Sequence, residues 1–143
     1  MKLVHIYLNF PGNTAEAMAF YETVFETKLI AKMTFGEVPW VQGASAEAKT
    51  KIMHSQLAIT EGVHLMASDF VEGLSPGKFV HGNDFSISIV AKDKAAADRA
   101  FELLSGNGGE VRMPLANAPW GPYFGMCTDR FGTQWMVSLE GPA

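Results

Sequence analysis

An internal repeat at a spacing of about 80 residues constrains the fold of this chain more than any other feature. Apolar residues at i, i+3, i+4 and i+7 form one helical face early in the sequence and again later. The two faces are Ala17, Phe20, Tyr21 and Val24, and then Ala97, Ala100, Phe101 and Leu104. This period is too long for a solenoid repeat and indicates a duplicated module. Because a strand-like run precedes each face and three follow it, we expect an α+β protein of two βαβββ modules.

The first copy is predicted to hold a strand, a helix and three further strands. These elements are expected at 2–10, 14–26, 29–35, 51–59 and 62–70. Asn13 is expected to cap the helix, with Glu16 completing a capping box. The second half of the connection at 36–50 is small and polar and is expected to be a mobile loop.

The second copy repeats this order after a segment rich in chain breakers. A strand is expected at 85–91, a helix capped by Asp93, and strands at 110–115, 123–129 and 133–140. The last strands of the two copies are similar in sequence, "HLMAS" and "QWMVS". The chain is therefore predicted to be a single domain, residues 1–143, with module one at 1–70, a linker at 71–83 and module two at 84–143.

The stretch from Trp120 to Gly132 combines large rings with several glycines. In "DRFG", Asp129 is expected to accept backbone N–H groups and Gly132 to adopt a positive φ, which predicts a type I turn between strands. The segment "PWGPYFG" leaves two interpretations open, a tight turn that leads into a strand or the aromatic wall of a pocket.

Composition argues against several classes of function. The net charge is −4 and basic residues are not clustered, so no nucleic acid is expected as a partner. No apolar run approaches the 18 residues that a membrane span needs, and the N-terminus lacks signal-peptide features. A cytoplasmic location is therefore the expectation. Cys127 lies in an apolar run and is predicted to be a buried thiol and not a nucleophile.

Segments along essentially the whole chain resemble the PhnB-like branch of the vicinal oxygen chelate superfamily. They are "NFPGNTAEAMAFYETVF", "KIMHSQLAI", "LMASD", "NGGEVRMPL", "PWG" and "DRFGTQW". That superfamily includes glyoxalase I, bleomycin-resistance proteins and extradiol dioxygenases. The resemblance implies two βαβββ modules, each with a sheet curled around a concave face, and a homodimer. Relatives are often labelled 3-demethylubiquinone methyltransferase, but this chain lacks the glycine-rich strand-to-helix turn that would hold a nucleotide-like methyl donor.

The resemblance also implies where metal ligands would lie, on the first and last strands of each module. These positions match His5, Met66, Ser86 and Met136. A thioether is a soft, neutral donor that neither offsets the charge of a divalent cation nor acts as a general base. We therefore expect no resident metal, although a divalent metal held by His5 and His64, with His54 as a further donor, is the alternative.

The sequence thus favours a protein that binds a small, partly apolar molecule in a concave sheet. Asn9 and Gln134 are further candidates for polar contacts to it. The predicted ligand-binding residues are His5, Tyr7, His54, Gln56, Met66, Trp120, Phe124 and Met136. Two alternatives stay open: a metal-dependent glyoxalase-, isomerase- or dioxygenase-type enzyme that uses His5, and a drug-sequestering resistance protein.

Overall fold

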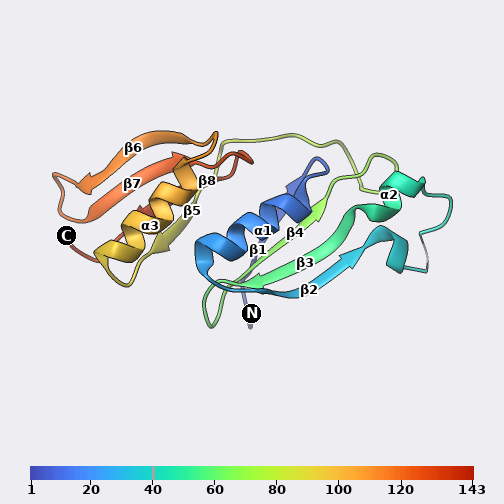
Figure 1. Cartoon of the computed structure of the whole chain (residues 1–143), viewed down its shortest axis with the longest axis horizontal. Coiled ribbons are helices and arrows are strands. Elements are labelled where there is room, and N and C mark those ends of the chain that lie inside the picture. Colours follow the sequence, from blue (N-terminus) through green and yellow to red (C-terminus); the bar gives the residue numbers. More distant parts are fainter. Residues whose placement is uncertain (40) are drawn as a thin grey trace. The chain divides into compact units, whose positions relative to one another are not determined.

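A computed structural model describes residues 1–39 and 41–143, and these residues divide into two compact units. The first unit is Met1–Val80 and the second is His81–Ala143. Each unit contains one four-stranded sheet with a long helix packed on it (Figure 1). The order strand, helix, strand, strand, strand occurs in both, which confirms the α+β fold of two βαβββ modules. No helix formed by the described residues is long and apolar enough to cross a membrane.

The sheet of the first unit, called sheet one here, places its first strand beside its last. Strand order is β1-β4-β3-β2, with β1 parallel to β4 and the other neighbours antiparallel. A short 3-10 helix (η1, Phe35–Glu37) and a short α-helix (α2, Ala46–Thr50) lie between β2 and β3. The main elements are β1 (Ile6–Phe10), α1 (Thr14–Phe25), β2 (Leu29–Thr34), β3 (Ile52–Ala58) and β4 (His64–Asp69).

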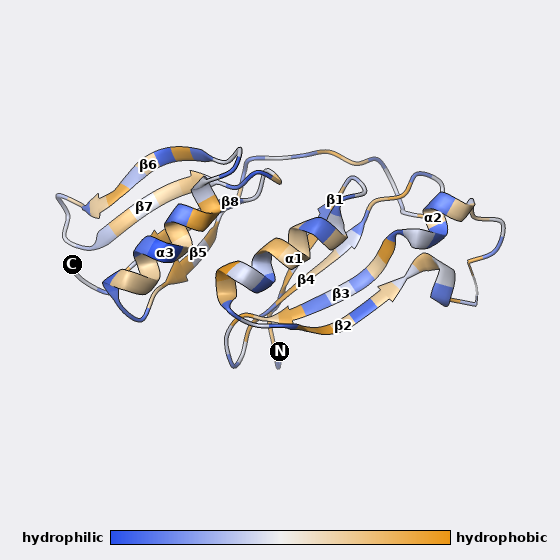
Figure 2. Ribbon diagram, viewed as in Figure 1, coloured by the Kyte–Doolittle hydropathy of each residue, from blue (hydrophilic) through white to orange (hydrophobic). Residues whose placement is uncertain are grey.

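The sheet of the second unit, sheet two, repeats this topology. Its strand order is β5-β8-β7-β6, again with the first strand parallel to the last. Figure 2 shows β6, one edge of this sheet, banded in hydrophilic and hydrophobic colours. The elements are β5 (Ile87–Val90), α3 (Lys94–Ser105), β6 (Glu110–Asn117), β7 (Tyr123–Thr128) and β8 (Gln134–Ser138).

Helix α1 covers one face of sheet one through its apolar stripe. Ala17, Tyr21 and Val24 are buried as predicted, but Phe20 is only half-buried, and Met18 is fully buried on this side instead. On the sheet, alternate residues meet the helix because side chains of a strand point to opposite faces. The fully buried residues Leu57 and Leu65 supply much of this contact.

Helix α3 covers sheet two in the same way, through Ala97, Phe101 and Leu104. It approaches β7 closely at Gly125, where a Cβ atom would lie 2.9 Å from the Phe101 ring. The same Cβ atom would lie 2.8 Å from Leu115 Cα on β6, so this glycine permits the close approach of both α3 and β6 to β7. Trp135 completes the core beneath the helix and is fully buried.

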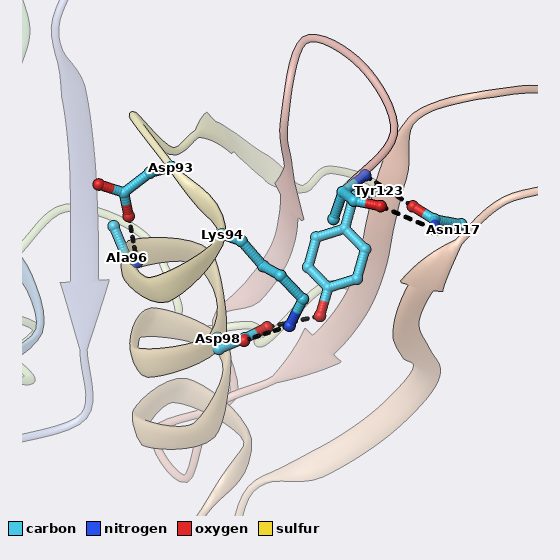
Figure 3. A network of polar contacts seen from close by, with 7 residues as sticks. Asp93, Lys94, Ala96, Asp98, Asn117 and Tyr123 are labelled. Atoms are coloured by element: carbon cyan, nitrogen blue, oxygen red, sulfur yellow. Dashed lines mark hydrogen bonds and ion pairs between the residues drawn. The ribbon is translucent and has the colours of Figure 1, made fainter.

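The two helices begin differently. Asp93 Oδ1 accepts the Ala96 N–H at 2.8 Å, which confirms the predicted cap of α3 (Figure 3). Asn13 makes no side-chain cap on α1, so the predicted capping box is wrong. Instead, Asp69 at the end of β4 accepts the Thr14 N–H at 2.9 Å and, through its other oxygen, the Ile52 N–H at 2.7 Å. One buried carboxylate thereby joins the start of α1 to the start of β3.

A surface network ties α3 to β7. Lys94 Nζ lies 2.6 Å from Asp98 Oδ2, and the Tyr123 hydroxyl donates to Asp98 Oδ1 at 2.5 Å (Figure 3). The Lys94 hydrogen bond, followed by that of Tyr123, lowers the pKa of the Asp98 carboxyl. Because the pair is exposed to solvent, we assign it a positioning role and no large share of the stability.

Two loop predictions have different outcomes. Asp129 Oδ1 accepts the N–H groups of Phe131 at 2.9 Å and Thr133 at 3.1 Å, and Gly132 has φ +90°, which confirms the predicted turn. The second half of the connection at 36–50 was expected to be a mobile loop but contains α2, which is capped by Ser45 Oγ at 3.0 Å from the Ala48 N–H. Trp40 of this connection lies outside the described residues.

We predict that Asp69→Ala destabilises the first unit by about 3 kcal/mol, since each buried N–H left without an acceptor costs about 1–3 kcal/mol. Asp69→Asn keeps one acceptor and should lose less. Urea unfolding measures both effects. Asp93→Ala is the matched control, because it removes an exposed cap worth about 1 kcal/mol. A loss for Asp69→Ala no larger than for this control would contradict the structural role assigned to Asp69.

Candidate functional site

The face of sheet one opposite α1, called the open face of sheet one here, carries the polar residues that the sequence singled out. Lateral neighbours in a sheet point to the same side, and Met66 is paired with Tyr7 on β1 and with Gln56 on β3. Strand alternation extends this face to both sides of Met66. Its polar and sulfur-containing members include Met33, which is paired with His54, and also His5, Tyr7, Asn9, His54, Gln56, His64, Met66 and Ser68.

Exposure separates the two faces of the sheet. Leu8, Leu57 and Leu65 on the α1 side are buried, whereas Tyr7 on the open face is 45% exposed and His64 and Met66 are half-buried. The alternation within β4 therefore places His64 and Met66 on the face opposite Leu65. None of the residues of the open face named above is Asp, Glu, Lys or Arg.

The rings of His5 and His64 contact each other on this face. Their rings are stacked, with centroids 4.6 Å apart and planes 15° from parallel. The backbone N–H of His64 donates to His5 Nδ1 at 3.1 Å. This contact follows from the strand order, because β1 runs parallel beside β4 and brings residues 5 and 64 level with each other.

The imidazoles of His64 and His54 are also hydrogen-bonded through Nδ1. Gln56 Nε2 donates to His64 Nδ1, and the Tyr7 hydroxyl is hydrogen-bonded to His54 Nδ1 at 3.3 Å. Further along the same strands, Ser68 Oγ donates to Asn9 Oδ1 at 3.1 Å. The open face of sheet one therefore carries separate groups of hydrogen-bonded side chains, and the bonds within each group limit the orientation of its members.

The hydrogen bond at His5 decides which protons this residue carries. A backbone N–H can only donate, so Nδ1 of His5 must hold a lone pair, and the neutral ring must carry its proton on Nε2. A histidine that binds a metal through Nε2 needs its proton on Nδ1, where it donates to an acceptor. His5 in this setting does not fit a metal ligand through either nitrogen. Among residues 1–39 and 41–143, no three His, Cys, Asp or Glu side chains are grouped as a metal site.

The family resemblance matched four positions to metal ligands, two in each unit. The strand pairing does not place the two positions of a unit beside each other. His5 lies beside His64, while Met66 lies beside Tyr7. In the second unit, Met136 is paired with Ser88 of β5, and Ser86 lies two residues earlier, just before β5 begins. Gln134 donates to the Phe85 carbonyl at 2.7 Å and thereby satisfies a backbone group.

Sheet two has an open face of different chemistry. Met136 is paired with Met126, and Met126 with Met113, so three thioethers from adjacent strands lie in one row. Met113 is 38% exposed and the other two are half-buried. Phe124, two residues from Met126, shares this face, and its ring meets Trp120 edge-on at 6.1 Å. Trp120 is 64% exposed.

The predicted ligand-binding residues thus fall on two surfaces. His5, Tyr7, His54, Gln56 and Met66 share the open face of sheet one. Trp120, Phe124 and Met136 belong to the second unit. Sequence reasoning missed Met113 and Met126. Met126 could have been found from its strand parity with Phe124, but Met113 required the register of β6 on β7.

Cys127 lies on the covered face of sheet two and has no exposed surface. Burial, with a smaller contribution from the charge of Asp129, raises the pKa of its thiol to about 12. The thiol is therefore uncharged at neutral pH, and a nucleophilic role does not fit this environment.

Comparison with known proteins gives a consistent result for the whole chain. The profile of the Glyoxalase/Bleomycin resistance protein/Dioxygenase superfamily matches residues 2–137. Protein YjdN from Escherichia coli (strain K12) is 30% identical over 141 residues, covering 93% of this chain and 92% of YjdN.

Two solved structures are similar over nearly their full lengths. Protein PA1353 from Pseudomonas aeruginosa is 38% identical, with a TM-score of 0.82 and coverage of 96% of this chain and 97% of the other. A PhnB protein from Bacillus cereus is 21% identical, with a TM-score of 0.73 and coverage of 95% and 98%. The second of these likenesses bears on the fold alone.

We predict that iodoacetamide alkylates Cys127 far more slowly in the folded protein than in urea. Raising the pKa from 9.0 to about 12 lowers the thiolate population by about a thousandfold at neutral pH. Because the folded protein holds this proton more tightly than the unfolded chain, the contribution of Cys127 to stability falls as pH rises from 9.0 towards 12. Mass spectrometry follows the alkylation of Cys127 over time. Equal rates in the folded and the urea-unfolded protein would contradict a buried, protonated thiol.

Proposed function

Because this chain belongs to the Glyoxalase/Bleomycin resistance protein/Dioxygenase superfamily, we propose that it uses the family fold to bind a small, partly apolar molecule without a resident metal ion. The observation that carries this proposal is the hydrogen bond from the His64 backbone N–H to His5 Nδ1. It occupies the lone pair of the imidazole that resemblance matched to a metal ligand.

The other residues at the positions matched to metal ligands do not make up for the loss of His5 as a ligand. Met66 and Met136 offer neutral thioethers, and hard divalent cations prefer carboxylate, carbonyl and imidazole donors. Neither thioether can act as the general base that a glyoxalase-type proton transfer needs. The donor set therefore supports binding better than metal-dependent catalysis.

The open face of sheet one supplies both parts of a binding surface for an organic molecule. Met66 and the Tyr7 ring are adjacent and provide polarizable apolar contact. The polar groups that flank them are oriented by hydrogen bonds to each other, and such preorganised groups fix the orientation of a ligand. Phe124 and Met136 on sheet two offer a second apolar surface of the same kind.

Membership of the superfamily does not select a reaction. Its description names glyoxalases, bleomycin resistance proteins and dioxygenases together. These functions differ in chemistry on a shared fold, so the role has to be argued from the residues of this chain. Sequestration of a drug-like compound is compatible with the same surface and is tested by the same screen.

We predict that protein purified without chelators holds much less than one equivalent of zinc, nickel or iron. Elemental analysis measures this. In a thermal-shift screen of aromatic and antibiotic-like compounds, a true ligand at a hundredfold excess over its Kd should add about 2.7 kcal/mol of stability. Tyr7→Ala and Met66→Ala should reduce that shift. Glu47→Ala on the exposed helix α2 is the control and should leave it intact.

One result would overturn the proposal directly. If the purified protein holds an equivalent of a transition metal, and His5→Ala releases it, then His5 is a ligand and the protonation state assigned here is wrong. If Tyr7→Ala leaves every ligand-induced thermal shift unchanged, the ligand does not bind on the open face of sheet one.

A further inference from the structure

We propose that the molecule bound on sheet one carries an oxyanion, held by the Nε2–H groups of His5 and His64 acting as paired hydrogen-bond donors. This inference rests on the proposed function, because it names the chemical group that the open face of sheet one recognises. It predicts a ligand with an anionic end next to an apolar body.

The first donor follows from the backbone contact already described. His5 Nδ1 accepts the His64 N–H at 3.1 Å, so the neutral His5 ring carries a proton on Nε2. With its single proton on Nε2 and its Nδ1 lone pair already used, the neutral ring has no further lone pair to offer. His5 therefore offers one donor and no remaining acceptor.

The second donor follows from Gln56. The amide nitrogen Nε2 of Gln56 can only donate, and its partner is His64 Nδ1. The neutral His64 ring must then carry its proton on Nε2 as well. Gln56 is held on the same face by its pairing with Met66, two residues along β4 from His64. It is a positioning residue, since it sets the tautomer of His64.

The two donors belong to neighbouring rings, whose centroids are 4.6 Å apart and whose planes are 15° from parallel. From this stacking we infer that one small group can accept from both. An oxyanion such as a carboxylate has two acceptor oxygens and makes stronger hydrogen bonds than a neutral carbonyl does. No Asp or Glu belongs to the open face of sheet one as defined above to compete for these donors. A cation, by contrast, would meet two N–H groups and no lone pair.

The neighbours of the pair indicate what the rest of the ligand is. Tyr7 on β1 lies two residues after His5, and Met66 on β4 lies two residues after His64. Tyr7 and Met66 are paired with each other. Both present apolar surface on the same face, and Tyr7 is 45% exposed. A flat aromatic or short apolar body bound there would place an anionic substituent beside the imidazoles. Aryl carboxylates and aryl phosphonates share this chemistry.

The proposal is tested first by NMR of the imidazole nitrogens. Long-range 15N–1H correlation spectra of the intact protein distinguish a ring protonated at Nε2 from one protonated at Nδ1. We expect the Nε2–H form for both His5 and His64. Titration with benzoate or phenylphosphonate should shift both Nε2 signals, and benzamide, a neutral analogue of similar shape, should bind at least about tenfold more weakly.

Two kinds of variant separate the donors from general charge effects. His5→Phe and His64→Phe keep a ring in place, remove one Nε2–H each, and should weaken benzoate binding roughly tenfold or more. Lys32→Ala is the matched control, because it removes a cation from the same sheet at a position paired with the covered residue Ser55. It should leave the Kd for benzoate unchanged.

Gln56→Glu tests the tautomer argument itself. A carboxylate beside His64 Nδ1 accepts a proton there, so the spectrum of His64 should change to the Nδ1–H form. Benzoate binding should fall, and Ni²⁺ binding by His64 Nε2 should rise, since a carboxylate behind a histidine favours ligation by its other nitrogen. Gln56→Glu that leaves the His64 spectrum and benzoate affinity unchanged would overturn the role of Gln56.

The outcomes distinguish this inference from the proposed function. Equal affinity for benzoate and benzamide, both lost in Tyr7→Ala, overturns the oxyanion and leaves binding on sheet one standing. An Nδ1–H spectrum for His5 overturns both, because both depend on that tautomer. Tighter binding of phenylphosphonate than of benzoate, or the reverse, supports the oxyanion and identifies which source of it the surface prefers.

Discussion

The parallel pairing of each module's first strand with its last is the constraint on which the rest of the structure depends. It makes β4 and β8 interior strands and places β1 and β5 at an edge. The helix that follows the first strand then covers one face of the sheet, and strand alternation leaves the other face open. Because β1 and β4 run in the same direction, residues 59 positions apart in sequence become neighbours, and His5 meets His64.

The two modules keep this architecture while using different polar groups to stabilise it. In the first unit, Asp69 joins the start of α1 to the start of β3 from within the core. In the second unit, Asp93 caps α3 locally, and Asp129 holds both a turn and the Trp135 indole N–H at 2.8 Å. The open faces differ too, with imidazoles on sheet one and thioethers on sheet two. A duplicated fold therefore presents two surfaces of different chemistry.

The candidate site could be predicted from the sequence only in part. Alternation within "HLMAS" was enough to place His64 and Met66 on one face and Leu65 on the other, because a single strand determines parity. Alternation could not identify His64 as the lateral neighbour of His5, because the register depends on how two strands that are distant in the sequence pair. The predicted N-terminal cap of α1 was wrong for a similar reason. Asn13 is the residue that local preference favours, yet Asp69, distant in sequence, supplies the acceptor.

The sequence by itself determined the duplicated βαβββ order, the helical faces and the "DRFG" turn, because these depend on contacts between residues close along the chain. Tertiary structure decided which side chains meet across strands and, through the His64 and Gln56 hydrogen bonds, which nitrogen of each imidazole carries the proton. A histidine has the same covalent structure wherever it occurs. Whether it offers a lone pair to a metal or a proton to an anion depends on the partner that folding places at Nδ1.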